Sequence, residues 1–585
     1  MRFVATQMVS LRKGLFALGL VALQASSASA QLVFDGNLLF NNNLTGTLAG
    51  QFVGAATAAA PSCVLPFSAA DLGTITYTHN RYADPLLPTA AYAPGVRPSF
   101  RPQLGSPAYG NSVTVPNDGF FKQTCYVGAL SENEAEDWTQ GWTYWDSTGA
   151  GRQDLHLVGM PTPRPLAVYD GVRIYGHQHW SADSNYFVRG QLRIKAQASL
   201  TIAPGVVIFQ EDASVGTIIA ERGGKLYAIG TACDPIIITS DAAPGTQTAG
   251  GGGGIVLNGY AKTNAVNSCA GDSAASEGGA IGFFGGNDDN DNSGTLRYVR
   301  VEFAGKEITP NNELNSFVWN ACGRNTRGDY LQSYQGDDDG FEWFGGTMDQ
   351  KYLLAVDGHD DGYDWQLGTR NRAQFVIVRV LPQRSRAGGQ FGDKGIEADN
   401  NSVTTFLACS GRSNTTVSNF TIVGDKRSGT LFPGVTSGVN FRVGTAGTFI
   451  NSIVYNMKTA ALRIDDQATF EAHCAAPPTA PSVFCSATTA GIGSGIDGQL
   501  FLASSLPNPF RAATTLSFTL PTAGPVSVEI YSADGRLVDT LAKGELPAGR
   551  HSLVWSASKR APSGMYFYKV IAGERQTSGK ITRID

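Results

Sequence analysis

The chain has 585 residues, of which only 16% are charged, while 70 are glycine. Low charge and high glycine argue against a helical bundle or a coiled coil, and a 42% hydrophobic content excludes wholesale disorder. The formal net charge of −5 gives no electrostatic support for nucleic-acid binding.

Residues 1–30 predict a secretory signal peptide. Cationic residues (Arg2, Arg12 and Lys13) accompany an apolar run from Gly14 to Leu23, and small residues end at Ala30. The apolar run is too short for a membrane anchor, which needs about 20 apolar residues. No later stretch is long and apolar enough to span a bilayer. We therefore expect an exported chain that starts at Gln31 and has no transmembrane segment after signal cleavage.

The exported chain contains eight cysteines, and none of them has the spacing of a metal-binding motif. An oxidising compartment favours four disulfides, and the local pair that we expect is Cys474 with Cys485, on either side of a Pro-rich loop. The alternative is that some of the thiols are free and buried.

Residues 31–171 are rich in Ala, Pro and Gly and contain isolated strand-like pieces, such as Phe100 to Ala108 and Phe120 to Leu130. We interpret this region as a β-rich cap that precedes the main repeat, because the open end of a solenoid must be covered.

Residues 172–473 contain short alternating apolar segments separated by Gly, Asp and Asn. Examples are QLRIKAQASLTIAPGVVIF, TLRYVRVEFAG and TVSNFTIVG, and such units recur every 20 to 30 residues. This pattern predicts an all-β solenoid, a parallel β-helix in which Val417, Phe420 and Ile422 face a shared core. The alternative is a large sandwich or a propeller, although no repeat of blade length is visible.

Several segments resemble a family of secreted bacterial right-handed β-helix proteins. They include SLTIAPGVVIF, AERGGKLYAIGTACDPIIITS, GGIVLNGYA, DNSGTLRYVRVEFAG, GDDDGFEWFGGT and KGIEADN, and together they cover about Val172 to Ile464. The resemblance implies a secreted or surface-located right-handed parallel β-helix. It supplies no catalytic residues.

The strongest local signal is acidic. Between Gly286 and Gln366 there are 16 Asp or Glu residues and 6 Lys or Arg residues. Three tracts dominate this segment, and they contain Asp288, Asp289 and Asp291; Asp337, Asp338 and Asp339; and Asp357, Asp360, Asp361 and Asp364. Asp338 and Asp361 lie 23 residues apart, about one coil, so we expect them to stack on adjacent turns.

Stacked carboxylates repel one another unless a cation, protonation or water relieves the repulsion. Calcium takes six to eight oxygen ligands in flexible geometry, so we expect these ten Asp residues to bind Ca²⁺ on one edge of the solenoid. The alternative is that Asp, Asn and Gly make the coil turns without any ion. The first tract nearly fits an EF-hand loop, but Arg300 occupies the position of the last ligand, which counts against that motif.

Catalysis is a further alternative for the acidic segment. A glycosidase needs two carboxylates at a set separation, and a lyase needs a cation and a basic proton acceptor. The candidate catalytic residues are Asp338, Asp361 and Asp364, with His359 or Arg379 nearby. No GxSxG, Walker, HExxH or Rossmann motif is present in the sequence.

Residues 474–500 read as a Pro/Ala/Ser/Gly-rich linker, and residues 501–585 as a small Ig-like sandwich with alternation of period two. This last module contains Asn508-Pro509-Phe510, Asp534-Gly535, Gly549-Arg550-His551 and Ser563-Gly564-Met565-Tyr566. With these features it resembles the C-terminal sorting domain of type IX secretion and the related flagellar hook-capping Ig-like domain. The resemblance implies recognition by the secretion machinery and delivery to the outer-membrane surface or the medium.

The sequence therefore predicts a secreted or cell-surface β-helix, more readily non-enzymatic than enzymatic. Its expected roles are adhesion, glycan contact or envelope structure, with polysaccharide or the cell envelope as partners and no nucleic acid. The alternative is a polysaccharide lyase or glycoside hydrolase that acts at the acidic face.

Overall fold

The computed structural model describes residues 32–42, 52–54, 79–88, 98–145, 164–243, 245–265, 274–276, 281–309, 312–380, 394–401, 411–424, 437–465, 469, 483–485, 503–506, 510–520, 523–533, 535–547, 549–556, 562–573 and 575–584. The predicted signal peptide and most of the predicted linker lie outside these residues. Within them, no helix is long and apolar enough to cross a membrane.

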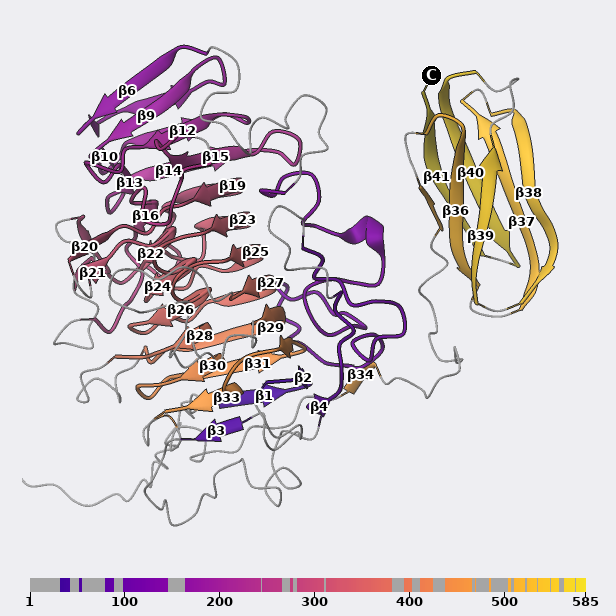
Figure 1. Cartoon of the computed structure of the whole chain (residues 1–585), viewed down its shortest axis with the longest axis horizontal. Helices are drawn as coiled ribbons and strands as arrows, with labels where there is room; N and C mark the ends of the chain where they lie inside the picture. The colour runs from indigo at the N-terminus through magenta and orange to yellow at the C-terminus, as the bar shows by residue number, and fades with distance from the viewer. Residues whose placement is uncertain are drawn as a thin grey trace, which may run out of the picture.

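The central part of the chain is a parallel β-helix, which confirms the predicted fold (Figure 1). Each coil contributes strands to a 17-stranded sheet, called sheet A here, and to an 11-stranded sheet, called sheet B. In one coil the chain passes from β10 (Gln191–Ile194) in sheet B to β11 (Ser199–Ile202) and β12 (Val207–Gln210) in sheet A. The next strand, β13 (Thr217–Ala220), then pairs in parallel with β10.

Sheet A has two sides. The other strands of its first side are β8 (His177–Trp180), β14 (Lys225–Ile229), β31 (Ala446–Ile450) and β1 (Leu32–Asp35). The other strands of its second side are β6 (Leu166–Asp170), β9 (Asn185–Arg189), β15 (Ile236–Ser240), β32 (Ile453–Tyr455), β2 (Leu38–Phe40) and β4 (Arg81–Tyr82). Five long strands run through both sides: β19 (Gly294–Glu302), β23 (Arg327–Tyr334), β25 (Gln350–Val356), β27 (Arg372–Arg379) and β29 (Asn414–Val423).

Sheet B is the third side of the solenoid. Its other strands are β7 (Arg173–Ile174), β16 (Ile255–Asn258), β22 (Phe317–Asn320), β24 (Phe341–Phe344), β26 (Tyr363–Gln366), β28 (Lys394–Ala398), β30 (Ser437–Phe441), β33 (Ala460–Ile464) and β3 (Phe52–Gly54). Short antiparallel pairs lie outside the coils: β17 (Ala274–Ala275) with β18 (Phe283–Phe284), β20 (Glu307–Thr309) with β21 (Asn312–Glu313), and β5 (Ser112–Val113) with β34 (Val483–Cys485).

Alternation along each strand explains how the coils form one core. Every second side chain points inward and stacks on its counterpart in the next coil, and the predicted core residues Val417, Phe420 and Ile422 are all fully buried there. Phe317 stacks on Phe341 with ring centroids 5.0 Å apart. Full burial of one such side chain contributes about 1.5–3 kcal/mol, so a continuous stack of them stabilises the solenoid along its length.

The long strands of sheet A bend at one residue per coil, and these residues form what we call the corner ladder. At each of these positions φ is positive, and the residue is left out of the ladder of paired residues. Between β19 and β23, for example, Arg297 pairs with Asp329 and Val299 pairs with Leu331, but the residues between them are not paired in the ladder. The members of the corner ladder are Tyr298, Tyr330, Tyr352, Phe375, Asn419 and Asn451. A bulky residue with positive φ is strained, so other contacts must hold these residues in place.

Stacking supplies part of that support. The ring centroids of Tyr298 and Tyr330 are 4.5 Å apart, those of Tyr330 and Tyr352 are also 4.5 Å apart, and Tyr352 and Phe375 follow at 5.3 Å. The corner ladder therefore begins as a continuous aromatic stack from Tyr298 to Phe375, and asparagines take the corner position in the next two coils.

Residues 112–145, which we call the strap, supply the rest of the support along the corner ladder. Trp142 meets the edges of Tyr298 and Tyr330, and Trp138 packs against Tyr352. The strap also contains the 3-10 helix η4 (Glu134–Glu136). It covers one side of sheet A with apolar side chains such as Val127, Ala129 and Leu130.

The asparagines of the corner ladder bind the strap by hydrogen bonds. The Asn419 Nδ2 group donates to the carbonyl of Gly128 at 3.1 Å. The Asn451 Oδ1 atom accepts from the Val113 N–H, and its Nδ2 group donates to the Val113 carbonyl, both at 2.7 Å. One segment near the N-terminus thus holds several successive coils together.

The first described strands of the chain complete the last coil. Strands β1, β2 and β3 pair in parallel with β31, β32 and β33, and Phe34 stacks on Phe449 at 5.1 Å. We expected residues 31–171 to cap the solenoid before its first coil. Strands β1, β2 and β3 instead extend the opposite end and residues 112–145 cover one side, while β6 pairs with β9 at the first end of the solenoid.

Residues 503–584 form two antiparallel sheets. One contains β35 (Ala503–Leu506), β36 (Ala513–Leu520) and β39 (Gly549–Ser556), and the other has the order β38 (Leu537–Leu546), β37 (Gly524–Ser532), β40 (Gly564–Ala572) and β41 (Arg575–Arg583). Their buried residues, among them Phe510, Trp555 and Tyr566, make a core of their own. The Ig-like assignment of this module stays a prediction.

Cys322 carries a free thiol that is buried in the β-helix core. A set of four disulfides from all eight cysteines is therefore wrong, and the alternative of a buried free thiol holds at this position. The predicted pair of Cys474 with Cys485 falls on side chains outside the described residues.

Candidate functional site

The second and third Asp tracts meet at the turn from sheet A to sheet B. One turn joins β23 to β24 and the next joins β25 to β26, and these strands pair with a 22-residue offset, Phe341 with Tyr363 and Glu342 with Asp364. The expected 23-residue stacking of Asp338 on Asp361 is therefore one residue too long. The register places Asp338 beside Asp360 and Asp339 beside Asp361.

Two of these aspartates form hydrogen bonds that build the turns. Asn315 Oδ1 accepts from the Asp339 N–H at 2.9 Å, and Asp339 Oδ1 accepts from the Asp361 N–H at 2.9 Å. Asp361 Oδ1 then accepts from the Lys394 N–H at 2.8 Å. Each side chain thus joins its coil to the next, as the alternative interpretation of the tracts expects.

Five carboxylates gather beside these turns, and we call them the acidic cluster. Carboxylate oxygens of Asp338, Asp339 and Asp360 lie within 4.8 Å of one another, and so do oxygens of Asp339, Glu342 and Asp364. Asp339 belongs to both groups and joins them. Such a set of oxygens matches the ligand preference of a hard divalent cation.

Glu342 and Asp364 reach the cluster because they alternate with core residues. They stand opposite each other on β24 and β26, between Phe341 and Trp343 in one strand and Tyr363 and Trp365 in the other. Those four neighbours point into the core, so Glu342 and Asp364 point out of it.

Three members of the cluster are buried although they point away from the core. The exposed fractions of Asp339, Glu342 and Asp364 are 7%, 3% and 6%. Burial raises the pKa of Asp339 well above its usual value, and the neighbouring charges of Asp338 and Glu342 raise it further. Burial likewise raises the pKa of Asp364 well above its usual value, with additional contributions from Glu397 and Asp399.

One oxygen of the cluster stands out because it lacks a hydrogen bond. Glu342 accepts hydrogen bonds from the side chains of Asn315 and Gln366, the latter at 2.8 Å. Asp364 Oδ1 is buried and has no hydrogen-bond partner in the described structure. A buried carboxylate oxygen without a partner is costly, so a cation or a proton at this position would stabilise the fold.

Two basic residues of later coils approach the same region. The Lys394 amino group lies 3.6 Å from Asp361 Oδ2 and 2.6 Å from Glu397 Oε1. Arg442 binds Asp399 through two hydrogen bonds of 2.9 and 2.8 Å and also pairs with Glu397. These ion pairs neutralise the negative charges of Glu397, on β28, and of Asp399, which directly follows that strand, one coil beyond the acidic cluster.

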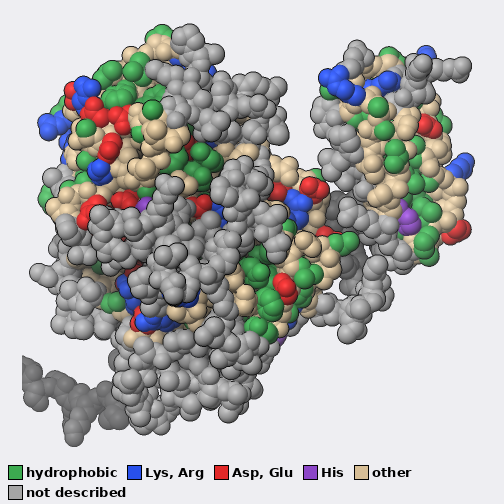
Figure 2. Space-filling view, viewed as in Figure 1, with side chains coloured by type: hydrophobic (Ala, Val, Ile, Leu, Met, Phe, Trp, Pro, Cys, Tyr) green, Lys and Arg blue, Asp and Glu red, His purple; other side chains and the backbone are tan. Residues whose placement is uncertain are grey.

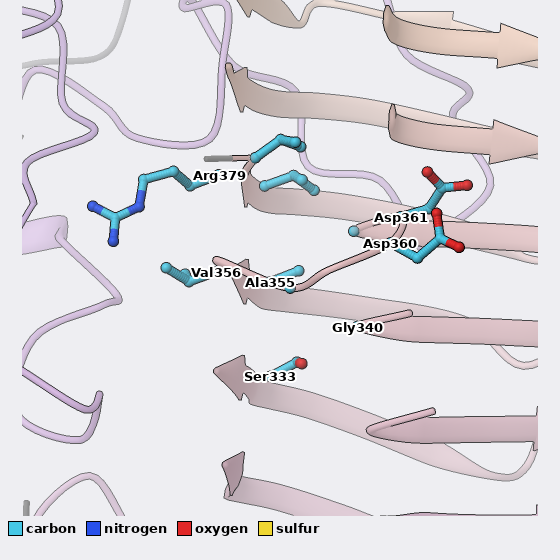
Figure 3. A pocket seen from close by; sticks show the side chains of 11 residues that line it. Ser333, Gly340, Ala355, Val356, Asp360, Asp361 and Arg379 are labelled. Atoms are coloured by element: carbon cyan, nitrogen blue, oxygen red, sulfur yellow. The ribbon is translucent and has the colours of Figure 1, made fainter. Parts of the chain in front are cut away.

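A small hollow opens beside the turns and is shown in Figure 3. Asp360 and Asp361 lie on one side of it, and the Arg379 side chain extends from the opposite side, away from both of them. Arg379 instead pairs with Asp357, with a 2.7 Å hydrogen bond from its Nε atom. Arg379 thus lines the same hollow as Asp361, as expected, but its guanidinium is paired with Asp357. The Asp357 carboxylate, a predicted metal ligand, is bound by Arg379 in this ion pair.

Asp337, a predicted metal ligand, pairs with His359, the other basic residue that we expected near the acids. His359 Nδ1 lies 2.8 Å from Asp337 Oδ1, and both side chains are mostly buried. This pair lies next to the acidic cluster in the sequence, but neither residue is a member of it.

The first Asp tract lies elsewhere. It precedes β19, a strand of sheet A, and thus occupies a turn from sheet B to sheet A. Asp289 pairs with Arg370 at 2.9 Å, and Asp291 accepts a hydrogen bond from Ser293 at 2.9 Å. Asp288 accepts from the Asn290 N–H at 3.0 Å. The ten predicted metal ligands are therefore not on one edge, and only Asp338, Asp339, Asp360 and Asp364 join the acidic cluster, with Asp361 adjacent.

On the face shown in Figure 2, small groups of Asp and Glu stand beside Lys and Arg. Asp339, Glu342 and Asp364, by contrast, are buried beside the turns between the sheets.

The comparisons with known proteins identify two parts of the chain. The family model for a pectate-lyase-like β-helix domain matches residues 173–484, and the model for a secretion system C-terminal sorting domain matches residues 505–583. No curated protein and no solved structure matches the chain. The sorting domain indicates a protein that is secreted or located on the cell surface, with a link to the type IX secretion system.

Proposed function

The chain belongs to the family of pectate-lyase-like β-helix domains, and we propose that it acts in this family as a non-enzymatic surface protein. Its role is adhesion, glycan contact or envelope structure, performed by the long sides of the solenoid. The observation that carries this proposal is the burial of Asp339, Glu342 and Asp364. Carboxylates enclosed in this way can hold an ion, but they cannot act directly on a polymer.

A divalent cation, which we propose to be Ca²⁺, is the partner of the acidic cluster. Asp338, Asp339, Glu342, Asp360 and Asp364 would hold it, and Asp364 Oδ1 is the oxygen whose lack of a hydrogen bond supports the assignment. The ion would join the turns of two successive coils and would balance charges that otherwise repel.

Thermal unfolding of the purified chain tests the cation. An ion that binds the folded but not the unfolded chain raises the free energy of unfolding by mass action, by about 2.7 kcal/mol at a free concentration 100 times the dissociation constant, and therefore raises the melting temperature. We expect a higher melting temperature in Ca²⁺ than in excess chelator. Equal melting temperatures, together with no calcium in elemental analysis, would contradict this part of the proposal.

Incubation with a panel of polysaccharides tests the non-enzymatic role. We expect co-sedimentation of the protein with at least one insoluble glycan or with envelope fragments, without new reducing ends or unsaturated products. Turnover of any polysaccharide would overturn the role, whatever the outcome of the calcium experiment.

The second candidate is a polysaccharide lyase or glycoside hydrolase. The match to a pectate-lyase-like domain favours it, and Asp338 and Asp360 are partly exposed at the rim of the acidic cluster. If turnover is found, the variants Asp338→Asn, Asp361→Asn and Asp364→Asn identify the site. Activity that survives all three changes within a few-fold would place the chemistry elsewhere.

A further inference from the structure

The four-stranded sheet of the C-terminal module carries a row of apolar side chains on its outer face. Strand pairing places Leu537 opposite Tyr531, Tyr531 opposite Phe567, and Phe567 opposite Lys580. Met565 stands two residues before Phe567 on the same face of β40. Leu537, Met565 and Phe567 are 55%, 43% and 41% exposed. We call Leu537, Tyr531, Phe567 and Met565 the outer row.

The outer row does not contribute to the core of the module. Along β40 the side chains alternate, so Tyr566, Tyr568 and Val570 are buried between the two sheets while Met565 and Phe567 point outward. A contiguous patch of large apolar side chains that is exposed to solvent and lies outside the core is typical of a binding surface.

The described side chains of the other sheet form no such row. Val554 on β39 is 61% exposed, but it stands opposite Thr515 and is flanked along its own strand by Ser552 and Ser556 on the same face. Isolated apolar side chains of this kind are ordinary on protein surfaces. Among the side chains that the structure describes, the two outer faces of the module therefore differ, and the contiguous apolar surface is the outer row.

Basic residues flank the outer row. Lys580 lies opposite Phe567 at the end of the row. Lys569 follows Phe567 by two residues on the same face of β40 and lies opposite Glu529. The Glu529 carboxylate already accepts hydrogen bonds from the hydroxyls of Tyr531 and Ser527, which lowers its pKa and occupies its oxygens. From Phe501 to Asp585, ten basic and six acidic residues give a net charge of +4. A partner that complements this face has an apolar centre and an acidic rim.

We propose that the outer row and its flanking lysines are the surface by which this sorting domain docks onto a protein of the type IX secretion machinery. The occupant is a folded protein surface with an apolar patch bordered by Asp or Glu. A C-terminal domain that directs export must be recognised by such a component, and residues 505–583 match the sorting-domain model. The inference does not depend on the role proposed for the β-helix.

Display of the full chain by a host with the type IX machinery tests the docking surface. The double variant Met565→Ser and Phe567→Ser removes two anchors, and the control Val554→Ser removes an apolar side chain that is even more exposed, on the other sheet. Loss of two anchors should lower binding by at least about tenfold, so the double variant should be depleted on the surface and retained in the periplasm. The control should be displayed like the natural chain. Protease shaving of intact cells measures both.

A second pair of substitutions keeps the test independent of folding. Lys569→Glu and Lys580→Glu leave the core untouched and would repel an acidic rim, so together they should also retain the protein in the periplasm. The melting temperature of each purified variant shows that it is folded. Normal surface display of a folded Met565→Ser/Phe567→Ser variant would overturn the docking surface. Normal display of the lysine variants alone would overturn the acidic chemistry of the partner.

Discussion

Asp364 is the residue whose replacement tests the cation site most directly. Its Oδ1 atom is buried without a hydrogen-bond partner and belongs to the group of oxygens formed with Asp339 and Glu342. Asp364→Asn keeps the shape and removes the charge. We expect the variant to lose most of the increase in melting temperature that Ca²⁺ gives the natural chain. In chelator the variant should be at least as stable as the natural chain, because an unpaired buried charge is gone.

The matched control is Asp288→Asn. Asp288 is exposed and lies in the first tract, away from the acidic cluster. This variant should respond to Ca²⁺ as the natural chain does. If both variants lose the calcium response, the ion binds at a different place.

The raised pKa values predict how stability depends on pH in the absence of Ca²⁺. Burial raises the folded-state pKa of Asp339 and Asp364, whereas the unfolded value stays near 3.9. The folded chain therefore binds more protons above that value, and stability falls as pH rises through the folded-state pKa. In chelator, the melting temperature should be higher near pH 5 than near pH 8, and the difference should shrink in Asp364→Asn. A melting temperature that rises with pH over this range would contradict the assignment.

The sequence indicated the acidic residues but not how they are grouped. Composition and the three Asp tracts pointed to the right segment, and the turn alternative describes Asp339 and Asp361 correctly. The register was misjudged by one residue, because aspartates one residue apart in neighbouring tracts look equivalent when the tracts are compared on their own. Glu342 was missed for the same reason. The repeat GDDDGFEW against GHDDGYDW carried the signal, since it aligns Glu342 with Asp364.

Among the elements, the strap and the corner ladder stabilise each other through Asn451. This side chain is fully buried, has a φ of 53°, and forms two hydrogen bonds with the backbone of Val113. Asn451→Ala would leave a buried N–H and a buried carbonyl without partners and would place alanine in an unfavourable conformation. We expect a loss of about 2–4 kcal/mol in the free energy of unfolding.

The control for this change is Asn287→Ala, at an exposed asparagine, which should alter stability by less than about 0.5 kcal/mol. Denaturant unfolding of both variants gives the comparison. Equal stability of Asn451→Ala and the natural chain would show that the strap does not depend on the ladder.

The elements were predicted unevenly from the sequence. Period-two alternation and Gly-rich turns indicated the strands of the β-helix, because these features are local. The corner ladder was not predicted, because tyrosine and phenylalanine are unfavourable at positive φ and only the stacking of neighbouring coils makes the conformation acceptable. The strap was missed because its residues contact coils that follow some 150 to 300 residues later in the chain, and no local pattern indicates such contacts.

On the scale of the whole molecule, the N-terminal strands of the chain complete the last coil of the solenoid. Strands β1 and β2 pair with strands more than 400 residues later, as in the pairs Phe34–Phe449 and Leu38–Ile453. Deleting residues 31–42 would expose the apolar face of the last coil. We expect the deletion to destabilise the chain and to make its last coils, near residues 437–465, the first target of limited proteolysis.

A deletion variant that resists protease like the natural chain would show that β1 and β2 are dispensable. No local pattern in the sequence predicted this closure, since parallel pairing depends on neighbours in space and the intervening coils determine which strands meet. The family resemblance gave the β-helix but not the strand order at its end.

The C-terminal module has a buried core whose members all lie between Phe510 and Ile581, separate from the core of the β-helix. Its net positive charge also contrasts with the acidic chain that precedes it. We therefore expect that deleting residues 501–585 leaves the thermal unfolding of the β-helix unchanged, because no residue of that core is removed. The same deletion should abolish surface display and leave the folded solenoid in the periplasm, because the sorting domain is lost. Cell fractionation and melting curves measure the two effects separately, and a truncated chain that reaches the surface, or that no longer melts cooperatively, would refute the separation.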